Sequence, residues 1–262
     1  MLSELQAALP GHPWRNRIHY FPTIDSTNTY AKQLARDGAP EGTIVIADHQ
    51  TGGRGRMGRS FSSPAGMGIY LSVILRPDCL PEALMHLTCA AGLAASDAVC
   101  AVTDRCPGIK WTNDLILARR KLGGILTELS VDAHTRKVEW AIIGIGINCC
   151  QRPEDFPPEI REIAISLGLS PADRPRLIAA LIQTLFTTNH GILTKKAEIM
   201  EQFRARCVTI GQEISILRGD QVSHGTALSV DDEGGLHVRL TDGSLTTVTS
   251  GEVSIRGMYG YL

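Results

Sequence analysis

The sequence has few aromatic residues and almost no net charge. Phe, Trp and Tyr make up 5% of its 262 residues, and the formal net charge is -1 at pH 7. A nearly neutral chain has no global field that attracts polyanions, so general nucleic-acid binding is disfavoured. Any attraction for an anion must therefore come from a local cluster of basic residues.

The chain also lacks the signals of export and of membrane insertion. Its first residues, MLSELQAALPGHPWRNR, have no basic start followed by an apolar core, and we find no apolar run of membrane-spanning length. These observations predict a cytoplasmic protein without a membrane partner. Residues 1–17 are too few for a helix-turn-helix domain, so no amino-terminal DNA-binding domain and no nucleic-acid partner are expected.

Metal and disulfide signatures are missing as well. The seven cysteines form no C-x-x-C pair, and the adjacent Cys149 and Cys150 are poorly placed for an ordinary bridge. The histidines show no metal-binding spacing. We therefore expect reduced, mostly buried thiols and no zinc site. No His–Asp pattern points to Cys149 or Cys150 as a nucleophile, so packing is the simpler role for both.

Apolar periodicity and turn signals predict a mixed α/β protein. Strands are expected at 43–48, 68–75, 125–131 and 140–148, with a hairpin or bulged strand over 109–117. Helical spacing occurs at 30–35, 81–102, 160–167, 174–189 and 195–206. After Cys207 the short β-like runs 214–217, 226–230, 236–240 and 245–249 are typical of a small barrel. We place a domain boundary near residue 208, which gives units of 1–207 and 208–262.

The chain does contain a local cluster of basic residues between two predicted strands. Residues 53–59 read Gly-Arg-Gly-Arg-Met-Gly-Arg, and no Asp or Glu occurs between Asp48 and Asp78. Glycine allows positive φ and close approach of backbone N–H groups, while arginine guanidinium groups match phosphate or carboxylate. This segment, called the Gly/Arg loop below, is therefore expected to bind an anion.

The Gly/Arg loop matches two phosphate-binding motifs only superficially. It satisfies G-x-G-x-x-G and comes within one residue of G-x4-G-K-[ST]. Both motifs need a helix directly afterwards, which the Ser, Pro and Gly residues of 62–68 disfavour. The H-R-D and D-F-G sequences of protein kinases are absent. A solvated basic hairpin and an RGG-like nucleic-acid contact remain alternatives, although Phe61 is the one aromatic residue nearby.

Three later segments place polar groups at predicted strand ends. They are Lys110 with Asn113 and Asp114, Lys121 before Leu122-Gly123-Gly124, and Gly144-Ile145-Gly146-Ile147-Asn148. Glycines inside strands mark close approach of a backbone or a ligand. The set combines cations, one carboxylate and glycine-lined walls. This combination suits attack of a carboxylic acid on the α-phosphate of ATP.

Single residues in these segments also have structural interpretations. Ser26 and Thr27 precede a predicted helix and, taken alone, are most simply its N-cap; a ligand role for Ser26 is compatible with this, since Thr27 or Asp25 can also cap the helix. Lys121 alone is one more solvated cation in a basic turn, and Asp114 is a common turn residue. Only the combination of segments favours a ligand site.

Five segments, in order, resemble the signature blocks of biotin protein ligases. They are Ile24-Asp25-Ser26-Thr27-Asn28, Gln50 with the Gly/Arg loop, Lys110-Trp111-Thr112-Asn113-Asp114, Lys121-Leu122-Gly123-Gly124-Ile125-Leu126 and Gly144-Ile145-Gly146-Ile147-Asn148. The resemblance covers about residues 18–150. It implies an α/β (α+β) catalytic domain with a mixed sheet like that of class II aminoacyl-tRNA synthetases, followed by a small SH3-like β-barrel domain.

The resemblance also implies an activity. Family members form biotinyl-5′-adenylate from biotin and ATP with Mg²⁺, release pyrophosphate, and pass biotin to a lysine of the biotin carboxyl carrier protein of acetyl-CoA carboxylase. A lipoate or octanoate protein ligase, which shares the fold, and a biotin-sensing transcription regulator are the alternatives. The Gly/Arg loop together with Lys-Trp-x-Asn-Asp favours biotin. A monomer and a homodimer are both compatible with the sequence.

Site residues follow from the resemblance position by position. The implied catalytic residues are Arg54, Arg56, Lys121 and Asp114. Those implied for biotin are Ser26, Thr27, Gln50, Gly53, Arg54, Arg56, Lys121, Gly124 and Gly144. Those implied for ATP are Arg56, Arg59, Phe61, Lys110, Asn113, Asn148 and Arg256. No metal ligand is assigned, and magnesium would arrive with ATP near Asp114.

Two positions depart from the family pattern. Thr112 stands where Pro is common, which changes local stiffness but no charge. Phe61 stands where Trp is often found, so a stacking surface for adenine is kept in smaller form. The Gly/Arg loop itself is expected to close over biotin and the adenylate.

Overall fold

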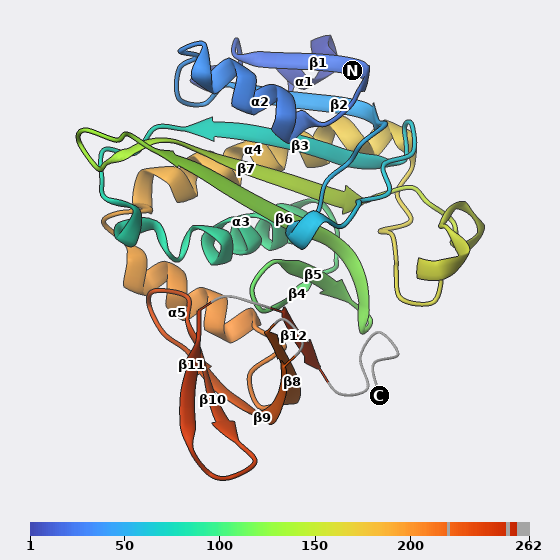
Figure 1. Ribbon diagram of the computed structural model, residues 1–262. Coiled ribbons are helices and arrows are strands. Elements are labelled where there is room, and N and C mark those ends of the chain that lie inside the picture. The colour runs from blue at the N-terminus through green and yellow to red at the C-terminus, as the bar shows by residue number, and fades with distance from the viewer. Residues whose placement is uncertain (219–220, 250–251, 256–262) are drawn as a thin grey trace.

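A mixed sheet of seven strands forms the larger part of the molecule (Figure 1). In the computed structural model, the described residues are 1–218, 221–249 and 252–255. The strand order is β1-β2-β3-β7-β6-β5-β4, with β1 parallel to β2 and every other neighbour antiparallel. The strands are β1 Ile18–Ile24, β2 Ile44–Gln50, β3 Gly68–Leu75, β4 Gly108–Lys110, β5 Asp114–Leu117, β6 Arg120–Val131 and β7 Val138–Asn148.

Helices cover the two faces of this sheet unequally (Figure 1). The helices α3 and α4 lie on one face and α2 on the other, while α1 contacts α4 and α5 contacts α3. Their bounds are α1 Leu2–Ala7, α2 Thr27–Arg36, α3 Leu87–Val102, α4 Arg174–Gly191 and α5 Lys196–Arg206. Short 3-10 turns are η1 Arg56–Gly58, η2 Pro81–Leu84, η3 Pro153–Asp155, η4 Pro158–Ile160 and η5 Pro171–Asp173.

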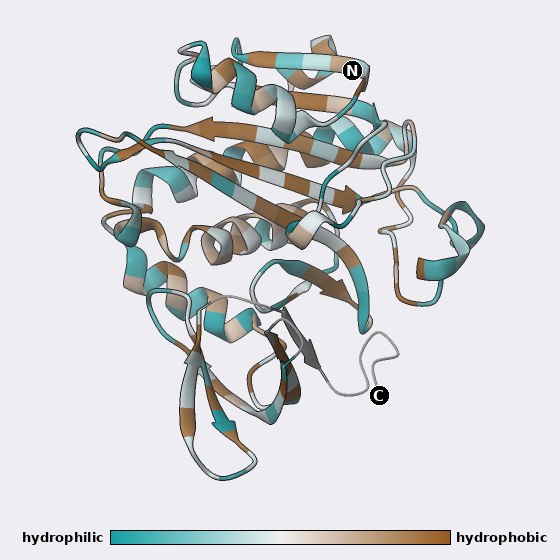
Figure 2. Ribbon diagram, in the orientation of Figure 1, coloured by the Kyte–Doolittle hydropathy of each residue, from teal (hydrophilic) through white to brown (hydrophobic). Residues whose placement is uncertain are grey.

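The alternation of side chains along the strands divides the core between the faces. On β3, Leu71 and Val73 belong to the large apolar cluster under α3 and α4, whereas Ile74 belongs to a smaller cluster with Ala31 and Ala35 of α2. This alternation follows from the two-residue repeat of a strand. Figure 2 shows the resulting apolar stretches along the central strands. Because α2 covers only part of its face, the rest of that face is open for a site.

The segment Pro81–Val102 corrects one expectation from the sequence. By length and composition it could cross a membrane, although we expected no such run. Most of the segment is buried inside the protein, where the small residues of α3 pack between the sheet and the helices α4 and α5. Core packing therefore explains its apolar composition.

A second, five-stranded antiparallel sheet follows α5. Its order is β11-β10-β9-β8-β12, with β8 Glu213–Arg218, β9 Gln221–Val230, β10 Leu236–Leu240, β11 Leu245–Val248 and β12 Glu252–Ile255. The predicted fold class, a mixed α/β sheet with a small carboxy-terminal β unit, is thus confirmed. Buried residues of this sheet, among them Ile216 and Leu236, join the same apolar cluster as the large sheet. The boundary near residue 208 stays a prediction.

Two local expectations are wrong. Residues 160–167 do not form a helix, because their backbone pairs with the start of β6: Lys121 N donates to Ile163 O at 2.7 Å and Ile165 N to Lys121 O at 2.9 Å. This pairing also starts β6 at Arg120 and not at Ile125.

The thiols differ in part from the expected reduced state. Cys100 and Cys106 form a disulfide between the end of α3 and the loop before β4, whereas the other five cysteines are free thiols. Burial raises the pKa of the Cys149 thiol to about 12, so this thiol stays protonated at neutral pH.

Candidate functional site

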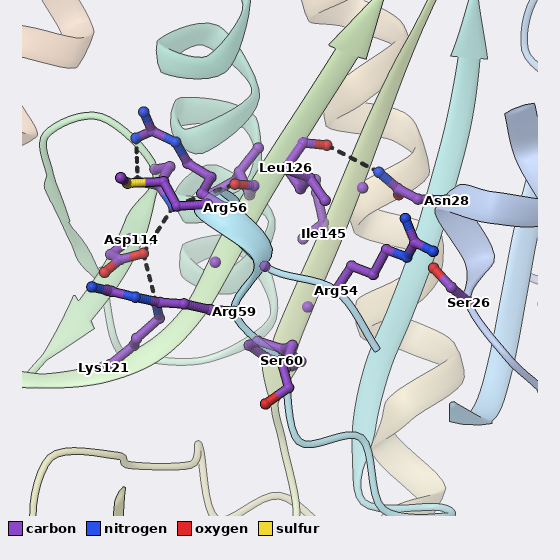
Figure 3. A pocket seen from close by; sticks show the side chains of 18 of the residues that line it. Ser26, Asn28, Arg54, Arg56, Arg59, Ser60, Asp114, Lys121, Leu126 and Ile145 are labelled. Carbon is purple, nitrogen blue, oxygen red and sulfur yellow. Dashed lines mark hydrogen bonds and ion pairs between the residues drawn. The ribbon is translucent and has the colours of Figure 1, made fainter. Parts of the chain in front are cut away.

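A cavity of about 200 Å³ opens on the sheet face that α2 leaves partly uncovered (Figure 3). It is lined by the start of α2, the end of β2, the Gly/Arg loop, the β4–β5 hairpin and the glycine-rich stretches of β6 and β7. These elements carry all five sequence blocks described above. The topology therefore brings the blocks together, because β7 and β6 lie between β3 and the hairpin β5-β4.

One end of the cavity is neutral and rich in hydrogen-bonding groups. The Gln50 amide oxygen accepts from Thr27 N at 2.8 Å and from the Thr27 hydroxyl at 3.1 Å. Since a backbone N–H can only donate, these bonds fix which way the amide points. Its nitrogen donates to the Ser63 hydroxyl at 2.9 Å.

Ser26 stands at the same end and begins α2. Its hydroxyl accepts from Thr29 N at 3.4 Å, so among the N-cap candidates Asp25, Ser26 and Thr27 it is Ser26 that caps the helix. It also lines the cavity, as Thr27 does. Capping uses an oxygen lone pair, so the Ser26 hydroxyl proton stays available for a ligand acceptor.

Asn28 supports this end from below and was missed as a site residue. Its amide nitrogen donates to a Glu128 carboxylate oxygen at 3.0 Å, and the Ser72 hydroxyl lies 2.6 Å from its amide oxygen and 2.8 Å from the Thr27 hydroxyl. Asn28 and Ser72 are buried. The network ties the first turn of α2 to β3 and β6. The one signal in the sequence was the position of Asn28 inside the first block.

The glycines of β7 make room for protein side chains. A Cβ atom on Gly144 would lie 2.0 Å from the Asn28 amide oxygen, and one on Gly146 would lie 2.6 Å from the Phe61 ring. At Gly124 on β6, by contrast, the nearest atom would be 3.6 Å away, which is ordinary contact. The absence of side chains at Gly144 and Gly146 therefore lets Asn28 and Phe61 pack directly against the backbone of β7.

The other end of the cavity is charged. Lys121 Nζ lies 2.8 Å from an Asp114 carboxylate oxygen, which also accepts from the Asn113 amide at 3.0 Å. The Lys121 side chain is 35% exposed and that of Asp114 15% exposed, so the pair faces the opening. Lys110, which is 6% exposed, lines the same end.

The Gly/Arg loop sends its arginines to both ends. Figure 3 shows Arg54 reaching toward Ser26, while Arg59 lies beside the Asp114–Lys121 pair. The loop is closed by a bond from Gly55 N to Arg59 O at 2.7 Å, and Gly58 within it has a φ of 74°. No helix follows it before β3 begins at Gly68, in agreement with the doubt about a phosphate-loop motif.

Arg56 connects the loop to the β4–β5 hairpin. Its guanidinium donates to the Thr112 hydroxyl at 3.1 Å and to the Asn113 amide oxygen at 2.9 Å. Among the described residues that line the cavity, the cations are Arg54, Arg56, Arg59, Lys110 and Lys121, and the one carboxylate is that of Asp114. The charged end is therefore suited to polyanionic groups.

Three residues predicted for the site are not found among those lining the cavity. Gly53 lies in the turn beside it, where a Cβ would meet Phe61 O at 2.4 Å. Asn148 is buried, and its amide donates to Ile165 O at 3.1 Å, which fixes the segment after β7. Arg256 lies outside the described residues.

The structure adds lining residues that were not individually assigned to a ligand, although all but Ser60 and Ile163 belong to the five blocks. Besides Asn28 they are Gly55, Met57, Ser60, Trp111, Ile125, Leu126, Ile145, Gly146 and Ile163. Ile163 comes from the segment wrongly predicted as helix. Which of the lining residues touch biotin and which touch ATP stays a prediction.

Two family models match the chain. Residues 20–148 match the biotin/lipoate A/B protein ligase family, and residues 209–256 match the biotin protein ligase C terminal domain. The first match contains all five blocks and ends at Asn148, the last residue of the fifth. All lining residues except Ile163 fall within it.

Comparison with individual proteins gives the same family. The chain is 34% identical to the bifunctional ligase/repressor BirA of Bacillus subtilis over 92% of this chain and 75% of that protein. It is 33% identical to the biotin--[acetyl-CoA-carboxylase] ligase of Mycobacterium tuberculosis over 93% of this chain and 90% of that protein. Among solved structures, the biotin protein ligase from Aquifex aeolicus in complex with biotin and ATP superposes with a TM-score of 0.75. Its sequence identity is 29%, and the match covers 91% of this chain and 98% of that chain.

Proposed function

Because this chain belongs to the biotin protein ligases of the biotin/lipoate A/B protein ligase family, we propose that it is an ATP-dependent biotin–protein ligase. It activates biotin as biotinyl-5′-adenylate with release of pyrophosphate. It then transfers the biotinyl group to a lysine of a biotin carboxyl carrier protein. The names of relatives that act on acetyl-CoA carboxylase support this choice of acceptor.

The observation that carries the proposal is that uncharged hydrogen-bonding groups of α2 and β2 build one end of the cavity, toward which Arg54 reaches, while Lys110, Lys121 and Arg59 line the other end. Biotin has a neutral ureido ring at one end and a carboxylate at the other. The ring would lie against Ser26, Thr27 and Gln50, and the carboxylate would point toward Lys121 and the Gly/Arg loop. This orientation leaves the carboxylate beside the groups that suit ATP phosphates.

The neutral end favours biotin over lipoate. Gln50 Nε2 carries two protons and Ser63 accepts one of them, while the Ser26 hydroxyl proton is not used by the N-cap. Both groups can donate to a ureido carbonyl. The dithiolane ring of lipoate offers only weak sulfur acceptors, so each buried donor left unpaired would cost about 1–3 kcal/mol.

At the cationic end the geometry supports acyl-adenylate formation. A carboxylate oxygen of biotin forms a bond to the α-phosphorus of ATP, and the bond to pyrophosphate breaks. The attacking group and the phosphates are all anionic, so Lys121, Arg56 and Arg59 lower the barrier by offsetting their charge. A unit pair at about 4 Å is worth roughly 4 kcal/mol at an effective dielectric near 20, so two or three such contacts dominate the rate.

Magnesium enters this scheme with the substrate ATP. Among the described residues, no three His, Cys, Asp or Glu side chains gather as a metal-binding group. In nucleotide sites Mg²⁺ usually keeps several waters and is bound by substrate phosphates and one or two carboxylates. Asp114 is the one carboxylate in the described lining, so it is the residue that would help to hold the ion, which would offset the charge of the phosphates. We also propose that the enzyme works in the cytoplasm, where its substrate ATP is available.

Exchange of labelled pyrophosphate into ATP tests the proposal. We expect exchange that requires biotin and is far weaker with lipoate or octanoate at equal concentration. Gln50→Ala should raise the biotin concentration needed for half-maximal exchange about tenfold, because it removes the group that fixes the neutral end. A folded sample that shows no exchange with biotin, or equal exchange with lipoate, would overturn the proposal.

A further inference from the structure

Trp111 is held by groups that come from beyond residue 207. Its backbone N–H donates to the Thr209 hydroxyl at 2.8 Å, and its indole N–H donates to Gly234 O at 2.8 Å. Trp111 is 3% exposed and lines the cavity, and Thr209 is fully buried. Residues of the carboxy-terminal part thus contact a wall of the site directly.

The partner of the indole lies in a well-built turn between β9 and β10, residues 231–235. One Asp231 carboxylate oxygen accepts from Glu233 N at 3.0 Å and from Gly235 N at 2.7 Å. Gly234 has a φ of +85°, which glycine adopts without strain. The Asp231 side chain therefore sets where the Gly234 carbonyl points.

This turn is also fixed to the helices. Arg204 of α5 donates to Val230 O at 3.0 Å and to an Asp232 carboxylate oxygen at 2.8 Å. A Cβ on Gly234 would lie 3.3 Å from the Cys89 sulfur on α3, so the turn is already in contact with that helix. The Gly234 carbonyl is consequently held at a set position relative to the large sheet.

Trp111 in turn controls the acceptors of the loop arginine. Thr112 and Asn113 follow it directly, and both receive hydrogen bonds from Arg56. The Asn113 backbone carbonyl also accepts from Ile125 N at 2.8 Å, which attaches the hairpin to β6. A displacement of Trp111 would therefore move the groups that hold Arg56 at the charged end. The neutral end is built by α2 and β2 and shares none of these contacts.

We propose that the turn 231–235 is a positioning element for the nucleotide end of the site and acts through the Trp111 indole. The inference rests on the proposed function. It assigns to Asp231 and Gly234 a role in ATP binding and adenylate retention, although neither lines the cavity. It also separates the two substrates: the KM for ATP and the dissociation rate of the adenylate depend on the turn more strongly than the affinity for biotin does, because the ureido ring of biotin lies at the other end.

Asp231→Ala tests the proposal because it removes the acceptor that shapes the turn. We expect a rise of about fivefold in the KM for ATP and a similar increase in the adenylate dissociation rate, corresponding to one hydrogen bond. The Kd for biotin, measured by calorimetry, should stay within twofold of the wild type. Asp231→Asn keeps an acceptor oxygen in place and should restore most of the loss.

Asp242 provides a matched control. It shapes the β10–β11 turn in the same way, accepting from Ser244 N at 2.9 Å, but it lies at the opposite end of β10. Asp242→Ala should reduce thermal stability about as much as Asp231→Ala does, without changing the KM for ATP. If both variants raise the KM equally, the turn acts only through general stability and the proposal is wrong.

The pathway through the indole is tested by a double-mutant cycle. Trp111→Phe keeps an aromatic ring and removes the N–H, and it should raise the KM for ATP about fivefold. Adding Asp231→Ala to Trp111→Phe should then have little further effect. Fully additive effects would contradict the proposal, even if Asp231→Ala alone proved unstable. A wild-type protein without biotin-dependent exchange would instead count against the proposed function.

Discussion

Lys121 illustrates how context changes the interpretation of a single residue. In the sequence it is one of three consecutive basic residues, which alone would suggest a solvated surface. In the structure it lies on β6, pairs with Asp114 at 2.8 Å and lines the cavity. The Leu-Gly-Gly sequence after it was the signal that distinguished it from its neighbours.

Lys121→Ala should suppress adenylate formation itself. Removing a preorganised cation that offsets developing charge typically costs a factor of 10² to 10³ in rate, and we expect a loss of this order. Single-turnover rapid quench with biotin and MgATP measures it. Lys137→Ala, which breaks an exposed ion pair with Asp78, is the control and should leave the rate unchanged. An unchanged rate in Lys121→Ala would remove this residue from the chemistry.

Arg56→Ala should act on retention of the adenylate. Arg56 bonds to Thr112 and Asn113 and belongs to a loop whose neighbours are largely exposed, so it contributes little to the core. We expect the bound adenylate to dissociate about tenfold faster while the Tm stays within 2 °C of the wild type. Adenylate release is followed by filter binding and the Tm by calorimetry. A large drop in Tm with normal retention would disprove a closing role for the loop.

Sequence motifs predicted which polar side chains line the cavity better than they predicted which polar side chains are buried in structural roles. Ser26, Gln50, Arg56 and Lys121 all line the cavity, because residues that bind charged or polar ligands recur in fixed patterns. Asn148 was assigned to ATP from the same kind of pattern, but it does not line the cavity and its amide donates to Ile165 O. Its burial depends on residues 151–165, which are distant in sequence and could not be placed by periodicity.

At the scale of elements, strands were predicted well and connections poorly. The run Gly68–Leu75 is apolar apart from Ser72 because β3 is buried on both faces, and this produces a strong signal. The segment 160–167 contains apolar residues at helical spacing. In the structure, however, the backbone of Ile163 and Ile165 forms hydrogen bonds with the backbone of Lys121 at the start of β6. Such pairing between distant segments overrides local propensity and is invisible in the sequence.

Gly144→Ala tests how tightly β7 and α2 fit. The new methyl group would lie 2.0 Å from the Asn28 amide oxygen, so the first turn of α2 must move. We expect a loss of about 1–3 kcal/mol in the free energy of unfolding and weaker biotin binding. Gly124→Ala on the neighbouring β6 is the control, since its methyl would have ordinary contacts and should cost under about 1 kcal/mol. Urea unfolding of both variants decides; equal losses would contradict the model of the fit.

The start of α3 should make stability sensitive to acid. His86 is fully buried, lies 2.9 Å from Ile192 O through Nε2, and has no partner on Nδ1. Burial lowers its pKa, and Lys196 acts in the same direction against the opposing charges of Asp232 and Glu233. In the unfolded chain the pKa of this histidine is near 6.5, so the unfolded state binds a proton more readily than the folded state does. The contribution of His86 to the free energy of unfolding is therefore fully present above pH 6.5 and is lost as the pH falls below this value.

Urea unfolding at pH 7 and pH 5.5 measures this effect. The wild type should lose stability between the two values, and His86→Gln, which does not titrate, should show a smaller loss. The pKa of His12 is also lowered by burial, so His12→Gln serves as the control. It should remove only the part of the pH dependence of stability that His12 itself contributes. An identical pH dependence in wild type and His86→Gln would show that the titrating group lies elsewhere.

The whole molecule joins two sheets into one functional unit. The large sheet presents the cavity, and the second sheet contributes buried residues to the same core and a hydrogen bond to Trp111. The sequence predicted both units from their different strand patterns. It could not predict their contact, because Trp111 and Gly234 are 123 positions apart and neither carries a motif that implies the other.

An ion pair between a buried arginine and a partly exposed aspartate holds the segment that contains the Gly/Arg loop. Arg174, at the start of α4 and 4% exposed, donates to Asp48 at 2.8 Å and to Gly68 O at 3.0 Å. These bonds hold the two ends of the segment that contains the Gly/Arg loop to one helix. The loop therefore begins and ends on a fixed base, while its arginines extend over the cavity.

The most direct test of a biotin–protein ligase is transfer to an acceptor. A purified carboxyl carrier domain is incubated with this protein, biotin and MgATP, and its intact mass is measured. The account predicts one biotinyl group per domain, dependent on both biotin and ATP, and no modification when the acceptor lysine is replaced by arginine. An unmodified carrier domain in a sample that another biotin ligase can modify, or equal attachment of lipoate, would contradict it.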